Sequence, residues 1–261
     1  MQTKFLFPFG QPVQEVVQAD RSEKKVFVLG VYASAVHARW VDANNKTKVR
    51  ALAVASEPYI FWRGENATEI IEQIDIPEPL GKLFTASKQL NGPSGIALDE
   101  MILDPLGLAR SDVWLCDLVP HSCVNPDQHA AIEREYSPLI TKYNLPIPSV
   151  PSVPNNLTDE KRRGAIYDEI IESRANTLIL LGDKPIQWFL KFYDNSWDKL
   201  SDFAKDRDSY GRICSAKIKG REINILPIAH PRQIAKLGAH NPIWYEYHQH
   251  WIRRTANNLF Q

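Results

Sequence analysis

The sequence has few cysteines and no excess of charge of either sign. Cys116, Cys123 and Cys214 are widely spaced and form no CxxC pair. This argues against a disulfide framework, a zinc ribbon and a four-thiolate iron–sulfur cluster, and we expect no metal site. Basic and acidic residues both total 31, so no overall field favours a nucleic acid or a membrane. Any DNA-binding surface must be local, and a reducing cytoplasm is the simplest compartment.

Long apolar runs and the common nucleotide motifs are also missing. No window approaches 18 uncharged apolar residues, and the first 16 residues lack the apolar region and cleavage site of a signal peptide. We therefore expect neither a membrane span nor a signal peptide. The absence of GxGxxG and GxxxxGK[ST] excludes a dinucleotide fingerprint and a phosphate-binding loop. Without GxSxG, an unrelated α/β hydrolase lacks support.

What the sequence does contain is an alternation of buried strands and helices. Short apolar runs predict strands at residues 26–29, 112–119, 177–181 and 222–228, and helical spacing predicts helices at 96–106, 158–174, 183–193 and 242–257. This order indicates an α/β protein with a mostly parallel sheet. We expect one domain over residues 1–261, with an N-terminal extension at 1–23 and a Pro-rich connection at 144–157.

The remaining segments are predicted from turn residues and alternation. Residues 48–60 alternate as a hairpin or edge strand, and 68–76 form a short helix. We expect loops at 30–37 and 81–92, and a hairpin between 212–219 and 222–228 joined at Lys219–Arg221. Thr158 is the expected N-cap of the helix at 158–174.

Unusual residues collect at the predicted strand ends: Gly30–Ser34, Asp117, Gly182–Asp183 and His230. In a parallel sheet these ends share one edge, so the residues could line a single ligand site. Two plainer interpretations stay open. His230 could merely cap its strand, and Asp117 could cap the next helix or pair with an arginine, because a buried carboxylate needs a partner.

The motifs in order resemble the uracil-DNA glycosylase superfamily. They are the glycine loop, PSGIALDEMI with DPLGL, VWLCDLV, TLILLG and ILPIAHP, and the resemblance covers roughly residues 24–254. The closest likeness is to the iron–sulfur branch, but the cluster cysteines are absent. The resemblance implies a three-layer α/β/α sandwich around a mostly parallel four-stranded sheet, with no cofactor.

The resemblance also implies an activity, the excision of a damaged base that is flipped out of DNA. His230, in the AHP sequence, matches the family's His-Pro motif and would donate a hydrogen bond to the departing base. Tyr32 stands where the family places an Asp, Asn or Glu that positions water. A phenol can hydrogen-bond water, but it is a poor base at neutral pH because its ordinary pKa is about 10.

The same resemblance assigns base-binding and DNA-binding residues. Asp117 replaces the family's Asn, and an ionised carboxylate offers only acceptors, so the base preference would be altered. Gly30, Ser34 and Phe84 match further base-binding positions. Past His230, Ile234 stands at the offset of an apolar wedge, although Ile234 and Leu237 could instead be core residues. Two flanking cations match phosphate contacts; they are Arg232 and Lys236.

Two functions remain open from the sequence. The first is a DNA glycosylase-like hydrolase, with DNA as its partner, acting as a cytoplasmic monomer. The alternative is a catalytically weak or inactive nucleobase or nucleic-acid binding protein that keeps the fold; Tyr32 and the neutral overall charge favour it. The basic clusters at Lys161–Arg163 and Arg253–Arg254 are expected to be solvated faces rather than DNA contacts.

Overall fold

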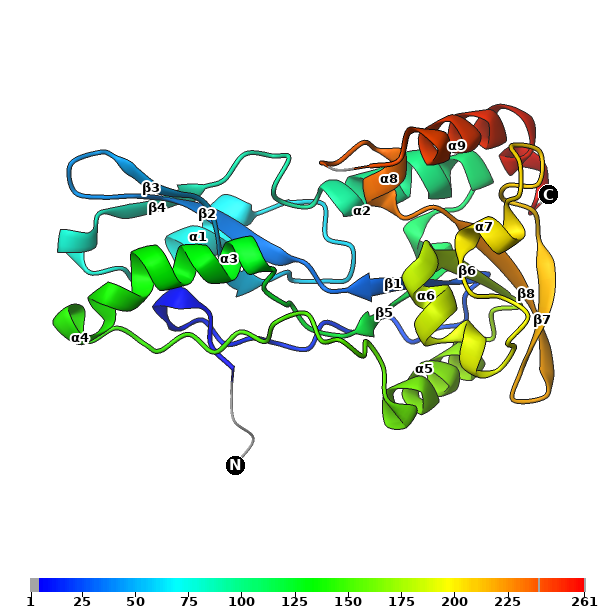
Figure 1. Ribbon diagram of the computed structural model, residues 1–261, viewed down its shortest axis with the longest axis horizontal. Coiled ribbons are helices and arrows are strands. Elements are labelled where there is room, and N and C mark those ends of the chain that lie inside the picture. The colour runs from blue at the N-terminus through cyan, green and yellow to red at the C-terminus, as the bar shows by residue number, and fades with distance from the viewer. Residues whose placement is uncertain (1–4, 239, 261) are drawn as a thin grey trace. The chain divides into compact units, whose positions relative to one another are not determined.

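The computed structural model describes residues 5–238 and 240–260. Contacts divide the chain into two compact units. The first holds the residues up to Val16, Tyr32–Pro93 and Pro120–Asn155, and the second holds Val17–Val31, Ser94–Val119 and the residues from Asn156 on. We describe each unit by itself (Figure 1), and the single domain over residues 1–261 stays a prediction.

The second unit is built on a five-stranded sheet with the order β5-β1-β6-β8-β7. Strand β1 pairs in parallel with β6, and β6 with β8, whereas β7 runs antiparallel to β8. The predicted α/β class with a mostly parallel sheet is therefore confirmed. The sheet has a fifth strand beyond the four expected, because the 212–228 hairpin adds β7 at its edge. The strands are β1 (Val26–Tyr32), β5 (Val113–Val119), β6 (Thr177–Leu181), β7 (Cys214–Ile218) and β8 (Arg221–Ile228).

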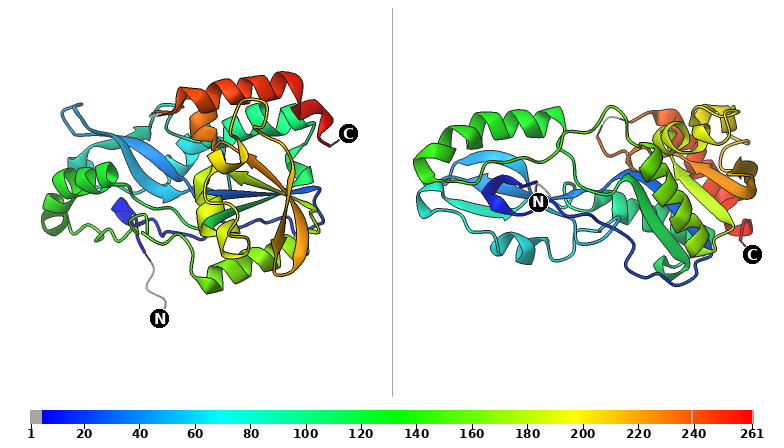
Figure 2. Two further views of the ribbon diagram at one scale, coloured as in Figure 1. Left: turned by 45° about the vertical axis from the view of Figure 1, so that its right-hand side comes forward. Right: turned by 90° about the horizontal axis from the view of Figure 1, so that it is seen from below.

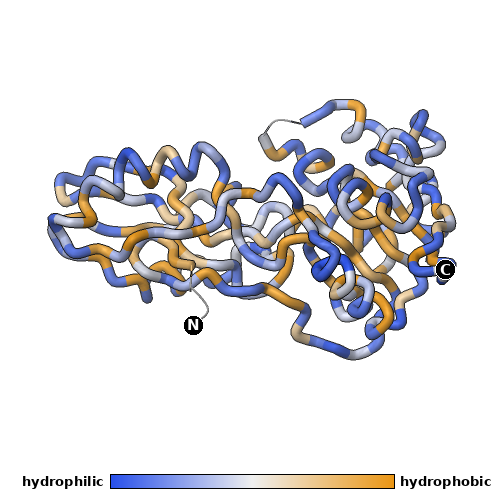
Figure 3. The backbone as a smooth tube through the Cα atoms, turned by 60° about the horizontal axis from the view of Figure 1, so that its bottom comes forward, coloured by the Kyte–Doolittle hydropathy of each residue, from blue (hydrophilic) through white to orange (hydrophobic). Residues whose placement is uncertain are grey.

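The central strands form because their apolar side chains are buried on both faces of the sheet. Every residue of β5 and β6 is buried, as are the first five residues of β1. Such runs are typical of parallel strands covered by helices on both sides. The hydropathy coloring shows these hydrophobic stretches inside the protein (Figure 3). At the sheet edge, Lys219 and Gly220 both have positive φ, of 48° and 81°, which suits the tight turn between β7 and β8.

Helices lie on both sides of this sheet. Helices α2 and α9 cover one side, and α5 and α6 cover the other (Figures 1 and 2). Helix α5 begins after Asp159, whose carboxylate accepts the Arg162 N–H at 2.7 Å. Thr158 is therefore not the N-cap; its hydroxyl instead donates to the Trp188 carbonyl. The helices of this unit are α2 (Pro93–Leu98), α5 (Glu160–Ser173), α6 (Asp183–Trp188), α7 (Leu200–Phe203), α8 (Pro231–Ile234) and α9 (Pro242–Arg254).

The first unit contains a three-stranded antiparallel sheet with the order β3-β2-β4. Its strands are β2 (Ala35–Val41), β3 (Thr47–Ser56) and β4 (Lys82–Thr85), and its helices are α1 (Ala67–Glu72), α3 (Pro126–Ala131) and α4 (Ile140–Tyr143). The loops predicted at 30–37 and 81–92 are partly wrong, because β2 and β4 begin within them. Both strands are short; β2 pairs with β3 across the turn at residues 42–46, and β4 pairs with β2, which is about 40 residues earlier in the sequence.

The core of the first unit is aromatic. Phe9, Trp40 and Tyr136 pack edge to face, with ring centroids 5.0–6.4 Å apart. The Trp40 indole N–H donates to the Leu80 carbonyl at 2.8 Å, and the Tyr136 hydroxyl bridges the Phe9 N–H and the Pro146 carbonyl. The predicted Pro-rich connection thus contributes to this core at Pro146. It has no regular helix or strand between α4 and α5.

Candidate functional site

The order of strands in the second unit points to one edge of its sheet. Strand β1 lies between β5 and β6, the two strands that follow it in this sheet along the chain. The connection after β1 therefore leads to β5 on one side of β1, and the connection after β5 leads to β6 on its other side. Open α/β sheets bind ligands outside the carboxyl ends of their strands at such a switch point. Gly30 is buried in β1 near this end, and His230 follows β8 by two residues.

His230 is held as a neutral hydrogen-bond donor. It is the N-cap of α8, and its Nδ1 accepts the Arg232 backbone N–H at 3.1 Å. An Nδ1 that accepts carries no proton, so the neutral ring carries its proton on Nε2. Burial and the nearby Arg232 charge lower the pKa of His230 to about 4. At neutral pH the ring is therefore uncharged, and Nε2–H is left to donate.

Gly182 lets the end of β6 lie directly against His230. Its φ is 83°, a left-handed conformation that favours glycine, and its N–H donates to the Ile228 carbonyl at 2.7 Å. A Cβ placed on Gly182 would lie 3.2 Å from the His230 Cβ. A side chain at position 182 would therefore press on the backbone and Cβ of His230 as well as strain its own backbone.

A second chain of hydrogen bonds holds the residue before His230. The Tyr210 hydroxyl accepts the Ala229 N–H at 2.9 Å and bonds to the His248 Nδ1 at 2.8 Å. Since the hydroxyl has one proton, that proton goes to Nδ1, and the His248 Nε2–H donates to the Met101 carbonyl at 2.8 Å. Burial lowers the pKa of His248 to about 4, which agrees with a neutral ring. The AHP segment is thus anchored to α9 and to the turn after α2.

Asp117 is a buried carboxyl group in β5, with 3% of its surface exposed. Burial raises its pKa to about 7, while the Arg162 charge and a hydrogen bond from the Val31 backbone act in the opposite direction. The Val31 contact also shows that β5 and β1 end at the same edge of the sheet. The raised pKa means that Asp117 stays protonated, and can donate as well as accept, to a higher pH than an exposed aspartate does; the base preference expected of an ionised carboxylate stays a prediction.

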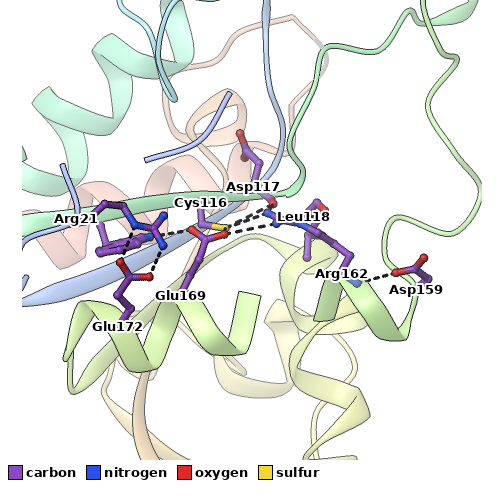
Figure 4. Close-up of polar contacts among 9 residues, drawn as sticks. Arg21, Cys116, Asp117, Leu118, Asp159, Arg162, Glu169 and Glu172 are labelled. Carbon is purple, nitrogen blue, oxygen red and sulfur yellow. Dashed lines mark hydrogen bonds and ion pairs between the residues drawn. The ribbon is translucent and has the colours of Figure 1, made fainter. Parts of the chain in front are cut away.

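The backbone of Asp117 is fixed by Arg162, which extends from the first turn of α5. The guanidinium donates to the carbonyls of Asp117 at 2.6 Å and Leu118 at 3.1 Å. It also forms an ion pair with Glu169 at 3.5 Å. Figure 4 shows the Asp117 side chain pointing away from this cluster. Arg162 therefore holds the strand end while leaving the carboxyl group on the opposite face.

The Arg162 cluster continues along α5. The Trp114 indole N–H donates to Glu169 at 2.9 Å, and the Arg21 guanidinium lies 4.5 Å from the Trp114 ring centroid and pairs with Glu172 (Figure 4). Arg162 is only 19% exposed at its side chain. The prediction that it belongs to a solvated basic face is therefore wrong, because its donors are used by backbone carbonyls and a half-buried carboxylate.

Three predicted site residues belong to the first unit. Tyr32 is the last residue of β1 and is 39% exposed, and the Ser34 carbonyl accepts the Ser122 hydroxyl. Phe84 lies in β4 with 44% of its surface exposed. The carboxyl edge of the second unit's sheet carries Gly30, Asp117 and the His230 segment, and Tyr32 ends β1 of the same sheet, whereas Ser34 and Phe84 lie outside it. Their roles stay predictions.

The DNA-contacting residues predicted after His230 differ in exposure. Ile234 is completely buried in α8, so a wedge role does not fit its position and the core alternative does. Arg232 and Lys236 are exposed. However, the Arg232 Nε donates to the Leu237 carbonyl at 3.0 Å, and the Lys236 ammonium lies 3.6 Å from the Tyr245 ring centroid. Both cations could reach phosphates only by giving up or sharing these contacts.

Sequence reasoning missed Arg162, Tyr210 and His248 as residues that hold the site. Arg162 carried one usable signal, its position three residues after an aspartate that could cap a helix. Tyr210 and His248 carried none, because their bonds join segments 19 and 38 residues apart.

Two kinds of feature are absent from the described residues. Between residues 5 and 260, leaving out 239, no three His, Cys, Asp or Glu side chains are grouped to hold a metal ion. Within the same part of the chain, none of the helices has the length and apolar composition needed to cross a membrane.

Comparison with known proteins adds no relative. Neither the protein-family models nor the curated proteins give a match to this sequence. The membership suggested by the motifs, in the uracil-DNA glycosylase superfamily, therefore stays a prediction.

Proposed function

We propose that the chain is a DNA glycosylase-like hydrolase that breaks the N-glycosidic bond of a damaged or deaminated base. The observation that carries the proposal is the state of His230. It lies at the carboxyl end of a buried strand, β8, on the same edge of the sheet as the switch point at β1 and separated from β1 by β6, with Nδ1 engaged by Arg232 and the proton on Nε2. A neutral donor fixed in this way suits a base oxygen on which negative charge develops.

The expected contribution of this donor follows from the charge of the transition state. As the bond breaks, the sugar becomes positive and the departing base becomes negative. A donor that is already oriented stabilises the base more in the transition state than in the ground state. Removal of one such donor typically lowers the rate by about 10²–10³-fold. Gly182 and the Tyr210–His248 chain support the role because they fix the His230 segment before a ligand arrives.

Asp117 is proposed to read the hydrogen-bonding edge of the base. When protonated, its carboxyl group offers one donor and one acceptor, as an amide does, so it could pair with a carbonyl and an adjacent N–H of uracil. When ionised, it offers acceptors alone and would favour bases with N–H donors. The raised pKa of about 7 lets both forms exist near neutral pH, so the base preference would change with pH.

A second function is favoured by Tyr32. The position where the resemblance expects a water-positioning carboxylate or amide carries a phenol, which is a poor base at neutral pH. A protein that binds a nucleobase or nucleic acid without turnover would need the pocket residues but no base. This alternative makes Asp117 important for affinity and leaves His230 without an effect on chemistry.

The two functions are separated by an abasic-site assay on duplexes that contain uracil, hypoxanthine or xanthine. The hydrolase proposal expects base release by the wild type and a fall of about 10²–10³-fold in His230→Ala. The matched control is His250→Ala, since His250 is a partly exposed histidine of the same unit that pairs with Asp208. Salt-sensitive DNA binding without release from any duplex would favour the binding protein. If the chain binds neither a nucleic acid nor a free nucleobase, both functions are refuted.

A further inference from the structure

The sheet of the first unit carries a row of residues that crosses all three strands. Arg39 of β2 is paired directly with Phe84 of β4. On the other side of β2, Ala38 pairs with Leu52 and Trp40 with Val49, and the register shifts between them. Two residues of β3, at positions 50 and 51, therefore stand opposite Arg39, in the arrangement of a β-bulge.

The two faces of this sheet differ in burial. Trp40, Val49 and Leu52 point to the core and are buried. On the other face the side chains of this row reach solvent. Arg39, Arg50 and Phe84 are all exposed. Lys82 is exposed as well and lies two residues before Phe84 on the same face.

The same three strands carry charge of one sign only. Their sequences AVHARWV, TKVRALAVAS and KLFT contain lysines and arginines and no aspartate or glutamate. Lys48 pairs with Glu135 at 3.5 Å and lies over the Trp40 ring. Among the residues that the structure describes, Arg39, Arg50 and Lys82 have no ion-pair partner. In a chain of zero net charge, this exposed face is a local positive surface.

The aromatic ring gives this positive surface a second property. The Arg39 guanidinium lies 5.2 Å from the Phe84 ring centroid, so one cation and one flat apolar ring are presented together. Unpaired bases stack on such rings, while the phosphates that join them are attracted by flanking cations. A duplex conceals its base faces within the stack, and an acidic peptide has no bases to stack on Phe84.

We propose that the exposed face of β2, β3 and β4 binds single-stranded nucleic acid, with Phe84 stacked on a base and Arg39, Arg50 and Lys82 beside the phosphates. The surface belongs to the first unit alone, and its role does not depend on base excision at His230. It would hold an unpaired stretch of strand regardless of the sequence, because stacking and phosphate contacts read no base edges.

The test uses the full-length chain and a fluorescein-labelled undamaged oligothymidylate, followed by fluorescence anisotropy at several salt concentrations. Phe84→Ala is expected to weaken binding roughly tenfold. Arg39→Ala and Arg50→Ala should each weaken it and reduce the salt slope by about 0.7. The matched controls are Phe192→Ala, an exposed phenylalanine of the other unit, and Lys142→Ala, an exposed lysine of α4; both should bind as the wild type does. Unfolding midpoints verify that the variants are folded.

Three results would overturn the inference. The first is unchanged affinity in Phe84→Ala while the variant is folded. The second is displacement of the labelled probe by a polyglutamate of the same net charge as effectively as by unlabelled oligothymidylate. This result would assign the face to an acidic protein partner. The third is tighter binding of a duplex of the same length. Because the probe contains no damaged base, a failure of base release leaves this test unaffected, and loss of strand binding in Arg39→Ala or Arg50→Ala is expected to leave the excision assay unaffected.

Discussion

The replacement Asp117→Asn removes one buried carboxyl group and keeps its shape. The wild-type pKa is raised from 3.8 to about 7 in the folded chain, so the folded state holds this proton more tightly than the unfolded state. A raised pKa contributes stability that is fully present below the unfolded value and is lost as the pH rises through the folded value. A rise of the pKa from 3.8 to about 7 corresponds to about 4 kcal/mol of folding stability. The wild type loses this stability as the pH rises from about 4 to about 7.

The asparagine variant has no such loss, because an amide does not titrate. Relative to the wild type, Asp117→Asn should therefore become more stable by about 4 kcal/mol between pH 4 and pH 8. The lowered pKa values of His230 and His248 weaken the fold at the acid end instead, where stability falls as the pH drops below about 6.5. They do so equally in both proteins and cancel in the difference.

The assay is urea unfolding at pH 4 and pH 8, with the free energy extrapolated to water. Asp168→Asn is the control, because it makes the same replacement at an exposed aspartate of α5. The comparison is between the free energies of unfolding of Asp117→Asn and the wild type. If their difference changes by less than about 0.5 kcal/mol from pH 4 to pH 8, the claim that Asp117 is a neutral carboxyl group in the fold is refuted.

Three further changes test the packing around the site by the free energy of unfolding. Ile234→Ala should cost about 2–5 kcal/mol as a buried residue; a wedge that only enters DNA would leave stability unchanged. Arg162→Met should cost about 3–5 kcal/mol, because it leaves a half-buried carboxylate and two carbonyls without their donor, whereas the exposed Arg174→Met should cost less than about 0.5 kcal/mol. Tyr210→Phe should cost about 1–3 kcal/mol by orphaning the buried Ala229 N–H; an unchanged midpoint would contradict the anchoring of the AHP segment.

The parts of the fold that follow from local pattern were predictable. Residues 177–181 and 222–228 are apolar, β-branched runs bounded by turn residues, and such runs become buried strands in most contexts. Strands β2 and β4 did not follow from local pattern, because each is stabilised by pairing: β2 with β3 and β4, and β4 with β2. Ile234 shows the same limit, since an apolar residue after His230 suits a wedge or a core equally well, and only the packing of α8 decides between them.

The candidate site was predictable in its positions but not in its charge states. The strand ends at Asp117 and His230 follow from the sheet pattern, yet their protonation depends on burial and on the Arg232 and Val31 backbone contacts. Those contacts come from the three-dimensional arrangement. The role of Arg162 was missed for the same reason, because a basic tripeptide in a helix is usually solvated, and here the middle residue faces β5.

The most direct measurement of the central claim is single-turnover base release from a uracil-containing duplex by the wild type, His230→Ala and His230→Gln. The account predicts release by the wild type, with a pH dependence near pH 7 that comes from Asp117 and is absent in Asp117→Asn; His230 adds none there, since its pKa is lowered to about 4. It predicts a loss of about 10²–10³-fold in the alanine variant and partial recovery in the glutamine variant, whose amide can donate. Equal rates in all three proteins, or no release by the wild type from any damaged duplex, would contradict it.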